Sequence, residues 1–179
     1  MKKLIVISIL FVGMLTSAVT SYKSAVKQNF DTNAKMKAVF VYNFTRYIEW
    51  PDEYKQGNFI IGLLGETSIT DELNKVAATK KAVNQTIEIK KFSSLSDVSE
   101  CHILYVSSKN SGDLASALQK TKGRSTLVIT EQEGLAAKGA GISFKIVANR
   151  QKFEINKGSI EKRKMTVGSA LLSLAIVVD

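Results

Sequence analysis

The chain reads Phe59-Ile60-Ile61-Gly62-Leu63-Leu64 over residues 59–64, an apolar run bounded by Gly57-Asn58 and by Gly65. A short run without alternating polar residues is typical of a strand that is buried on both faces of a parallel sheet. A capped helix is expected next, over residues 67–79, with Ile69, Leu73 and Val76 or Ala77 on its buried side. Together, the strand and the helix predict a β-α unit from which a layered fold can be built.

Three further strands are expected along the chain. Residues 86–90 alternate between polar and apolar side chains and predict a half-exposed strand, whereas residues 102–106 and 126–129 resemble the first buried run. A helix over residues 112–120, stopped by Gly123, separates the last two strands. This repeated order predicts an α/β fold, a three-layer sandwich with a mostly parallel sheet between helices.

The two ends of this core have different patterns. Residues 33–48 predict a helix, which ends before Trp50-Pro51 because the residue before proline disfavours the helical conformation. Its expected apolar stripe consists of Met36, Phe40, Phe44, Tyr47 and Ile48. Residues 141–147 and 152–155 predict a C-terminal antiparallel hairpin, and residues 169–177 predict a packed terminal helix. No repeat or long linker interrupts residues 33–179, so we expect a single domain there.

The first 21 residues have the layout of a secretory signal peptide. Lys2 and Lys3 form a basic start, residues 4–15 are apolar or small, and small polar residues follow over residues 16–21. The apolar run is shorter than the about 20 residues that a membrane-spanning helix needs. An uncleaved membrane anchor is the alternative. We expect cleavage after Ala18 or Ser21, followed by a loose leader over residues 22–32.

The charge balance is strongly basic, with 25 Lys and Arg against 16 Asp and Glu. Removal of residues 1–21 would leave 23 basic and 16 acidic residues, a formal net charge of +7. An exported protein does not normally meet DNA, so we expect no nucleic-acid partner. Anionic lipid head groups or an acidic protein surface suit this charge better.

The residues that most enzymes and zinc sites require are nearly absent. The chain has one cysteine and one histidine, which cannot supply the four protein ligands of a structural zinc site or form an intramolecular disulfide. Cys101 and His102 are neighbours on an expected strand, so their side chains point to opposite faces and cannot act as a nucleophile and base. We therefore expect no catalytic residue, no metal site, no cofactor and no enzymatic activity, with Cys101 buried.

Two groups of residues are candidates for contact with a partner protein. Tyr42, Arg46 and Trp50 lie on or just after the first expected helix, where they are harder to bury on one stripe than their aromatic neighbours. The second group is a basic tract near the C-terminus, composed of Lys162, Arg163 and Lys164. A core role for the aromatic residues and a solvated surface for the basic residues are the alternatives.

A ligand site is the other hypothesis, because ligands of open α/β sheets bind beyond the carboxyl ends of the parallel strands. In this chain those ends lie near Gly65, Ser107 and Thr130. The loop over residues 62–68 lacks both the G-x-G-x-x-G spacing and a glycine-lysine ending, so it favours a plain tight turn over a nucleotide-binding loop.

Three segments together resemble the YfiR-like family of bacterial periplasmic proteins. The first, over residues 37–51, contains Tyr42-Asn43-Phe44 and Glu49-Trp50-Pro51. The second is Cys101-His102-Ile103-Leu104-Tyr105-Val106-Ser107, and the third runs from Gly141-Ile142-Ser143-Phe144 to Phe153-Glu154-Ile155-Asn156. A leucine-rich segment over residues 171–175 is also similar, so the resemblance extends over residues 34–177.

The resemblance implies a periplasmic α/β regulator without known catalysis. The best-studied relatives bind the periplasmic sensor domain of an inner-membrane diguanylate cyclase and hold the enzyme inactive, which lowers cyclic-di-GMP and exopolysaccharide or biofilm output. Relatives also form dimers and use disulfides, so a homodimer is an expectation here, but Cys101 alone departs from the disulfide pattern. We expect a repressor whose partner is the outer domain of a cyclase or sensor kinase, with a periplasmic small-molecule-binding module as the alternative.

Overall fold

The computed structural model describes residues 32–179. The signal peptide predicted over residues 1–21 and the leader predicted over residues 22–32 lie outside this range, except for residue 32, which is helical. Residues 35–179 form one compact unit. Within the described range, every helix is too short or too polar to cross a membrane.

The centre of this unit is a parallel sheet around β2 (Phe59–Leu64). Its neighbours are β4 (Gln85–Phe92) on one side and β5 (Ile103–Val106) on the other, and β6 (Leu127–Thr130) follows β5. The chain thus reverses the direction in which it adds strands between β4 and β5, which places a topological switch point at the carboxyl ends of β2 and β5. The predicted buried strands and the parallel sheet are confirmed.

The sheet is completed by shorter or antiparallel strands, giving the order β10-β8-β7-β6-β5-β2-β4-β3. The predicted hairpin consists of β7 (Ile142–Val147) and β8 (Arg150–Asn156). Both residues of its turn, Ala148 and Asn149, have positive φ, as a tight two-residue hairpin requires. At the other edge, β3 (Lys81–Ala82) pairs antiparallel with β4.

The C-terminal helix is much shorter than its predicted span of residues 169–177. Helix α5 covers Ser169–Leu172, and the chain then forms strand β10 (Ile176–Val178), which pairs parallel with β8. The β-branched residues of β10 favour a strand, and the open edge of β8 supplies the hydrogen-bonding partner. A separate two-stranded sheet joins β1 (Ile48–Glu49) to β9 (Thr166–Val167).

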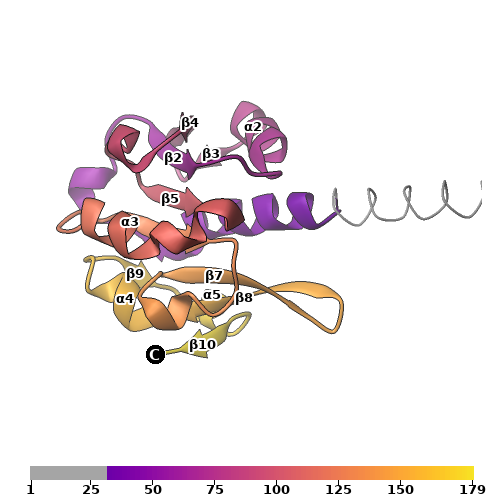
Figure 1. The fold of residues 1–179 in the computed structure, drawn as a ribbon. Helices are drawn as coiled ribbons and strands as arrows, with labels where there is room; N and C mark the ends of the chain where they lie inside the picture. Colours follow the sequence, from indigo (N-terminus) through magenta and orange to yellow (C-terminus); the bar gives the residue numbers. More distant parts are fainter. Residues whose placement is uncertain (1–31) are drawn as a thin grey trace, which may run out of the picture. The chain divides into compact units, whose positions relative to one another are not determined.

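Helices cover both faces of the large sheet, as the three-layer prediction requires. On one face, Leu114 and Ala117 of α3 (Leu114–Lys120) pack with Leu104 and Val128. On the other face, the first helix, described over residues 32–47, packs Phe44 against rings of β7 and β8. Figure 1 shows α3 in front of the sheet and the first helix passing behind it.

The remaining elements are helices. Helix α2 (Thr70–Thr79) packs on β4. The others are α4 (Lys157–Glu161) and the 3-10 helices η1 (Asp52–Tyr54), η2 (Leu95–Asp97), η3 (Ser108–Asp113) and η4 (Ala136–Lys138).

The buried stripe of the first helix differs from the predicted one. Met36 is 40% exposed and Tyr47 is 39% exposed, whereas Ala38 and Val41 are buried beside Phe44. The small side chain of Ala38 allows the helix to approach the sheet closely, so the contact face is rotated toward the smaller residues. The prediction from large apolar residues alone was therefore wrong for Met36 and Tyr47 and omitted the smaller buried residues Ala38 and Val41.

Candidate functional site

Arg163 connects the turn after α4 to the carboxyl end of α3. Its Nη1 donates to the Thr121 carbonyl at 2.9 Å and to Thr121 Oγ1 at 3.1 Å, and its Nη2 donates to the Leu118 carbonyl at 3.3 Å. Burial lowers the pKa of Arg163, but a guanidinium remains charged at neutral pH. The side chain thus supplies a cation to carbonyl groups that the end of a helix leaves without partners.

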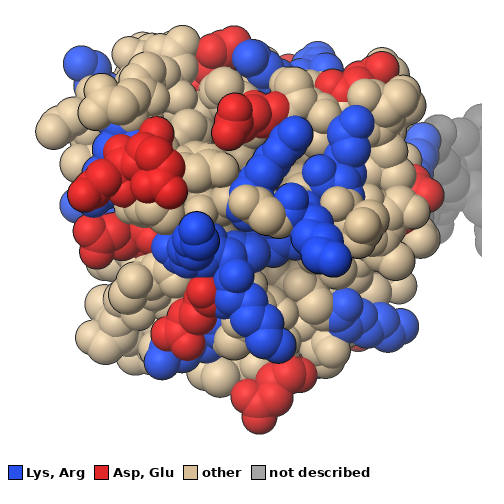
Figure 2. Space-filling view, turned by 90° about the vertical axis from the view of Figure 1, so that its left-hand side faces the viewer, with Lys and Arg blue, Asp and Glu red and all other residues tan. Residues whose placement is uncertain are grey.

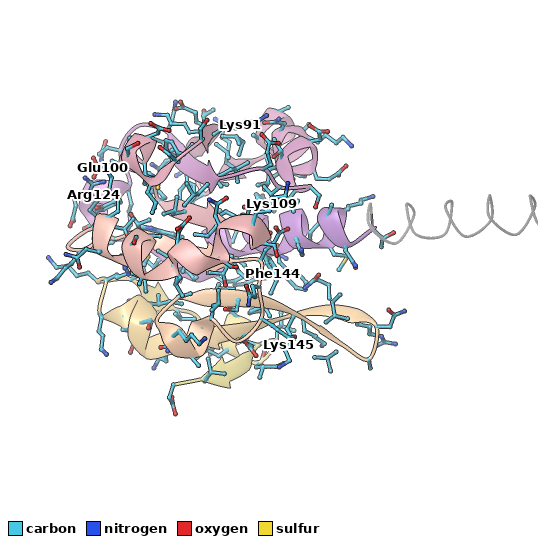
Figure 3. All side chains as sticks on the ribbon, viewed as in Figure 1. Lys91, Glu100, Lys109, Arg124, Phe144 and Lys145 are labelled. Atoms are coloured by element: carbon cyan, nitrogen blue, oxygen red, sulfur yellow. The ribbon has the colours of Figure 1, made fainter. Side chains whose placement is uncertain are left out.

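This connection brings two basic segments together. We call the resulting group the basic surface, and it consists of Lys120, Lys122, Arg124, Lys162, Arg163 and Lys164. None of these six residues forms an ion pair with any acidic residue in the described part of the chain. Figure 3 shows Arg124 at one end of the sheet, beside Glu100. Figure 2 views the molecule from that end and shows Lys and Arg side chains gathered near the middle of the face.

The basic surface contains three of the predicted contact residues, and they differ in exposure. Lys162 and Lys164 are exposed, whereas the guanidinium of Arg163 is engaged in the bonds to α3. The contribution of residues 120–124 to this surface was not predicted from the sequence. Their alternating positive charges were visible in the sequence, but their proximity to residues 162–164 depends on the fold.

His102 binds the segment after the first helix to the sheet. Its Nδ1 accepts a hydrogen bond from the Ile60 N–H at 3.0 Å, so Nε2 carries the proton and donates to the Tyr54 carbonyl at 2.8 Å. The ring also stacks on Phe59 with a centroid distance of 4.3 Å. Burial lowers the pKa of His102, which keeps the ring neutral. His102 lines a pocket of about 520 Å³. Lys164 of the basic surface lines the same pocket.

Cys101 lies on the opposite face of the sheet from His102, and its surroundings do not activate its thiol. It is buried in the apolar cluster under α3, whose other members include Phe92 and Leu104. Burial raises the pKa of Cys101 to about 12, and the nearby charge of Arg124 offsets only part of this increase. A thiol with this pKa is protonated at neutral pH and is a poor nucleophile.

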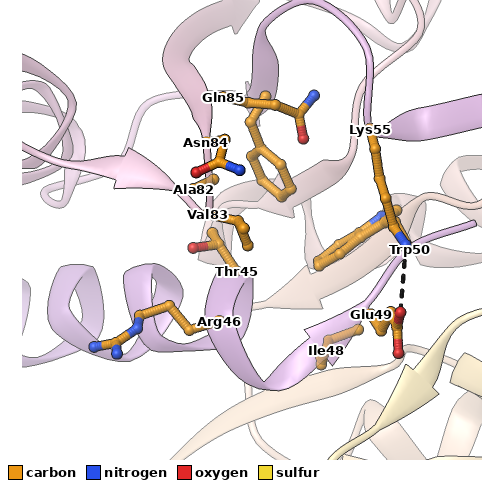
Figure 4. A pocket seen from close by; sticks show the side chains of 11 residues that line it. Thr45, Arg46, Ile48, Glu49, Trp50, Lys55, Ala82, Val83, Asn84 and Gln85 are labelled. Carbon is orange, nitrogen blue, oxygen red and sulfur yellow. Dashed lines mark hydrogen bonds and ion pairs between the residues drawn. The ribbon is translucent and has the colours of Figure 1, made fainter. Parts of the chain in front are cut away.

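Trp50 lies in the wall of a second pocket, which has a volume of about 380 Å³ (Figure 4). Its Nε1 donates to the Ser125 carbonyl at 2.9 Å, and its ring meets Phe59 edge to face. Arg46 also lines this pocket, but in Figure 4 its guanidinium extends away from Trp50. The structure therefore brings Arg46 and Trp50 to one pocket, with Arg46 exposed and Trp50 only 5% exposed. Tyr42 is half-buried and does not line it.

The turn between β3 and β4 forms part of the rim of the same pocket. Val83 has a φ of 54°, although β-branched residues rarely adopt the left-handed conformation, and it is 74% exposed. Such strain is often found where a loop serves a function rather than stability. No signal in the sequence singled out Val83, because valine is not a usual residue for positive φ.

The residues of the ligand hypothesis lie together at the carboxyl ends of β2, β5 and β6, but they are closely packed. Ser107 and Thr130 are fully buried. Ser107 Oγ donates to Asn110 Oδ1 at 3.0 Å, and the hydroxyl groups of Thr130 and Ser143 are 2.9 Å apart. Neither of the two pockets described above includes Gly65, Ser107 or Thr130.

A largely buried carboxylate that was not predicted from the sequence lies at the same edge. Glu131 directly follows β6, and its Oε1 accepts from Lys37 Nζ at 3.0 Å and from Thr67 Oγ1 at 3.2 Å. Its Oε2 accepts from the Ser108 N–H at 3.0 Å. No group of three or more His, Cys, Asp or Glu residues within residues 32–179 could hold a metal ion.

The fold and this site define an α/β protein whose single cysteine and histidine serve in packing and hydrogen bonding. The model of the YfiR/HmsC-like family matches residues 34–176. The chain therefore belongs to this family, whose members are periplasmic regulators rather than known enzymes. The resemblance predicted from the sequence is confirmed.

Two solved structures show a distant similarity. An ABC domain in complex with L-Trp from Streptococcus pneumonia has 13% sequence identity and a TM-score of 0.49, and the match covers 67% of this chain and 55% of that one. A conserved domain protein from Vibrio cholerae O1 biovar El Tor strain N16961 has 15% identity and a TM-score of 0.49, with coverage of 68% and 55%. The chain thus spans just over half the length of either protein. No curated protein matches the chain.

Proposed function

We propose that this protein binds the outer sensor domain of an inner-membrane signalling enzyme of the diguanylate cyclase type and represses that enzyme. The main support for this proposal is the match to the YfiR/HmsC-like family over residues 34–176. Repression would lower cyclic-di-GMP and, through it, exopolysaccharide or biofilm output. The partner could also be the outer domain of a sensor kinase, and the protein itself could act as a homodimer.

The basic surface supports this proposal. Lys120, Lys122, Lys162 and Lys164 are exposed and form no ion pair with any residue between 32 and 179. Charges of one sign on one face attract a partner of the opposite sign and raise the rate of association. We propose an acidic patch on the sensor domain as the contact of Lys162 and Lys164. The rim of the Trp50 pocket, with Arg46 and the adjacent helix residue Tyr42, is the second proposed contact.

Repression requires that the protein distinguish between two states of its partner. A ligand that binds both conformations of a sensor equally shifts neither of them, however tightly it binds. We propose that the protein binds the inactive conformation of the sensor domain more tightly. It would then hold the cyclase inactive without any chemical step of its own, so we propose that it is not an enzyme.

Export is part of the proposal. We propose that residues 1–21 are a signal peptide, residues 22–32 a leader and residues 33–179 the working domain in the periplasm. Mass spectrometry of the protein recovered from the periplasmic fraction tests this directly. A mass that begins after Ala18 or Ser21 is expected, whereas an intact N-terminus in the membrane fraction would contradict it.

Crosslinking in native cells, followed by affinity capture of the tagged protein and mass spectrometry, tests the function. We expect recovery of an inner-membrane cyclase or kinase that has a periplasmic sensor domain. Recovery of the protein alone, from cells in which export is confirmed, would contradict the proposal.

A matched pair of variants tests the proposed surface. The double substitution Lys162→Glu and Lys164→Glu should weaken capture of the partner about tenfold or more, because a surface of opposite charge repels an acidic patch. The double substitution Lys91→Glu and Lys109→Glu changes the net charge equally, but at exposed positions outside both proposed contacts. This control should retain capture. Equal losses in both variants would indicate a general charge effect and would contradict a contact at the basic surface.

A further inference from the structure

The Glu131 carboxylate lies among hydrogen-bond donors that converge from three separate stretches of the chain. Lys37 belongs to the first helix, Thr67 follows β2, Tyr105 is in β5 and Ser108 follows it. The side chains of Lys37 and Glu131 are only 17% and 10% exposed, so their charges are largely removed from water. These donors meet at the switch point of the sheet, where open α/β folds bind ligands.

The Tyr105 hydroxyl is a further hydrogen-bond donor beside Glu131, in addition to the three donors that Glu131 engages. Its side chain is fully buried, and its hydroxyl forms no hydrogen bond of good geometry with any described residue. Glu131 and Thr67 are nevertheless close enough to influence it: burial raises the pKa of Tyr105, and the charge of Glu131 adds to this increase. The hydroxyl therefore remains a protonated donor directed at the Glu131 cluster. A buried donor whose hydrogen bonding is incomplete is costly, and it needs an explanation beyond packing.

We propose that Lys37, Thr67, Tyr105 and Ser108 form a binding site for a small oxyanion, a carboxylate or a phosphate, which competes with the Glu131 side chain. An anion in this position would accept from the Lys37 ammonium, the Thr67 hydroxyl and the Ser108 N–H, as Glu131 does now. A phosphate has more acceptor oxygens than a carboxylate and could also accept from Tyr105. This site goes beyond the regulator function and does not depend on it.

The competition has a physical consequence for affinity. In the wild-type chain the anion must displace an acceptor that is covalently held nearby, so binding requires a higher concentration of the free anion. Without the Glu131 carboxylate, the Lys37 ammonium would remain largely buried without a counter-ion, which is strongly unfavourable. A free anion would then restore the missing charge and stabilise the folded state in proportion to its occupancy.

The test is chemical rescue of a Glu131→Ala variant by inorganic phosphate and, separately, by acetate. The variant should unfold at a lower temperature than the wild type, and the anions should raise this temperature saturably. Chloride at the same ionic strength should not. The midpoint of the phosphate titration should lie about tenfold or more below that of the wild type, because no internal competitor remains. The phosphate and acetate arms distinguish the two ligand chemistries.

Glu154 provides a matched control. Its Oε1 accepts from Lys145 Nζ at 3.1 Å, its Oε2 accepts from the Gly134 N–H at 2.7 Å, and its side chain is 7% exposed. Lys145, however, is 34% exposed and can be hydrated when the carboxylate is removed. Glu154→Ala should therefore lose stability without a saturable rescue by anions. Equal rescue of both variants would overturn the proposal.

The proposal also requires that phosphate bind to the wild-type chain. The Ser108 amide signal of nitrogen-labelled protein should shift during a phosphate titration, and Lys37→Met should abolish the shift. If Glu131→Ala is rescued but the wild-type signal does not move, the cluster is only an ion pair and the proposal fails. Absence of rescue in a folded Glu131→Ala variant also overturns it. If that variant does not fold, Glu131→Ser, which also removes the charge and leaves the anion position open, undergoes the same titration with the same criteria.

Discussion

His102 and Tyr54 are joined by a 2.8 Å hydrogen bond from the imidazole Nε2 to the backbone carbonyl that follows the first helix and β1. Because Nδ1 accepts from the Ile60 N–H, both ring nitrogens are engaged and the neutral ring fits the site in one tautomer. The side chain thereby fixes the segment that carries Trp50 against β2 and β5. The only histidine thus lines one pocket and stacks on Phe59, which lines the other.

This arrangement predicts a pH-dependent stability. Burial lowers the pKa of His102 in the folded chain, whereas the unfolded chain has an ordinary histidine pKa of about 6.5. The unfolded state therefore binds more protons in mildly acidic solution. The contribution of His102 is fully present above about pH 6.5 and is lost as the pH falls through the lower folded pKa.

Urea unfolding at several pH values, between about pH 8 and pH 5, measures this effect. His102 is the only histidine, so a comparison with His102→Asn isolates its titration from that of the carboxylates. Asparagine can still accept from the Ile60 N–H but does not titrate. The stability of the wild type should fall more steeply with acid than that of the variant. Parallel curves would mean that His102 does not titrate differently in the two states.

The strands at the centre of the fold were predictable because their signals are local. Residues 59–64 and 127–129 are continuous apolar runs, and a strand buried on both faces requires this pattern. The terminal helix was overestimated for the opposite reason. Residues 176–178 are apolar in either conformation, and the edge of β8 that they pair with lies about twenty residues earlier in the chain. Periodicity cannot show such a pairing.

The candidate site was only partly predictable. The charges of residues 162–164 are visible in the sequence, but their proximity to Lys120 and Lys122 results from the Arg163–Thr121 contact, which spans 42 residues. Trp50 was selected because it was harder to bury on the apolar stripe of the first helix than its aromatic neighbours. The helix ends at residue 47, and the Ser125 carbonyl, distant in sequence, draws the indole into the core. Glu131 was not predicted because its three hydrogen-bond partners come from three distant segments of the chain.

A side chain at Gly65 should lower the stability of the fold more than a side chain at Gly57. It has a φ of +80°, and a Cβ added to it would lie 1.9 Å from Asn110 Oδ1 and 2.7 Å from Ser107 Oγ. Gly57 is the matched control, since its φ is +68° but nothing lies within 4 Å of an added Cβ. Gly57→Ala should cost about 1–2 kcal/mol of conformational strain. Gly65→Ala should cost about 1–3 kcal/mol more through overpacking. Denaturant unfolding measures both, and equal losses would show that the contact with Asn110 relaxes freely.

Cys101 should be unreactive in the folded protein. Burial raises the pKa of its thiol to about 12, so the reactive thiolate is scarce at neutral pH. A chromogenic disulfide reagent should label the native chain only as fast as the chain unfolds and should label it at once in denaturant. Lys122→Cys in a Cys101→Ala background places a thiol at an exposed position and is the control for fast labelling. Fast labelling of native Cys101 would contradict its burial.

Arg163 should contribute to stability, whereas its neighbour Lys162 should not. Arg163→Met removes three charge-assisted hydrogen bonds to α3 and leaves its carbonyl groups without that cation, which should cost about 2–3 kcal/mol in denaturant unfolding. Arg163→Lys restores the charge but not the planar fork, so it should recover only part of the loss. Lys162→Met, at an exposed position, should stay within about 0.5 kcal/mol of the wild type.

The same variants separate the stability of the basic surface from its role in binding. Arg163→Met should also weaken partner capture, because the loop over residues 120–124 loses its connection to the turn after α4. Lys162→Met should weaken capture without a change in stability, since it removes only a contact charge. If Arg163→Met lost neither stability nor capture, the bonds to Thr121 and Leu118 would not hold the two basic segments together. The basic surface would then need another explanation.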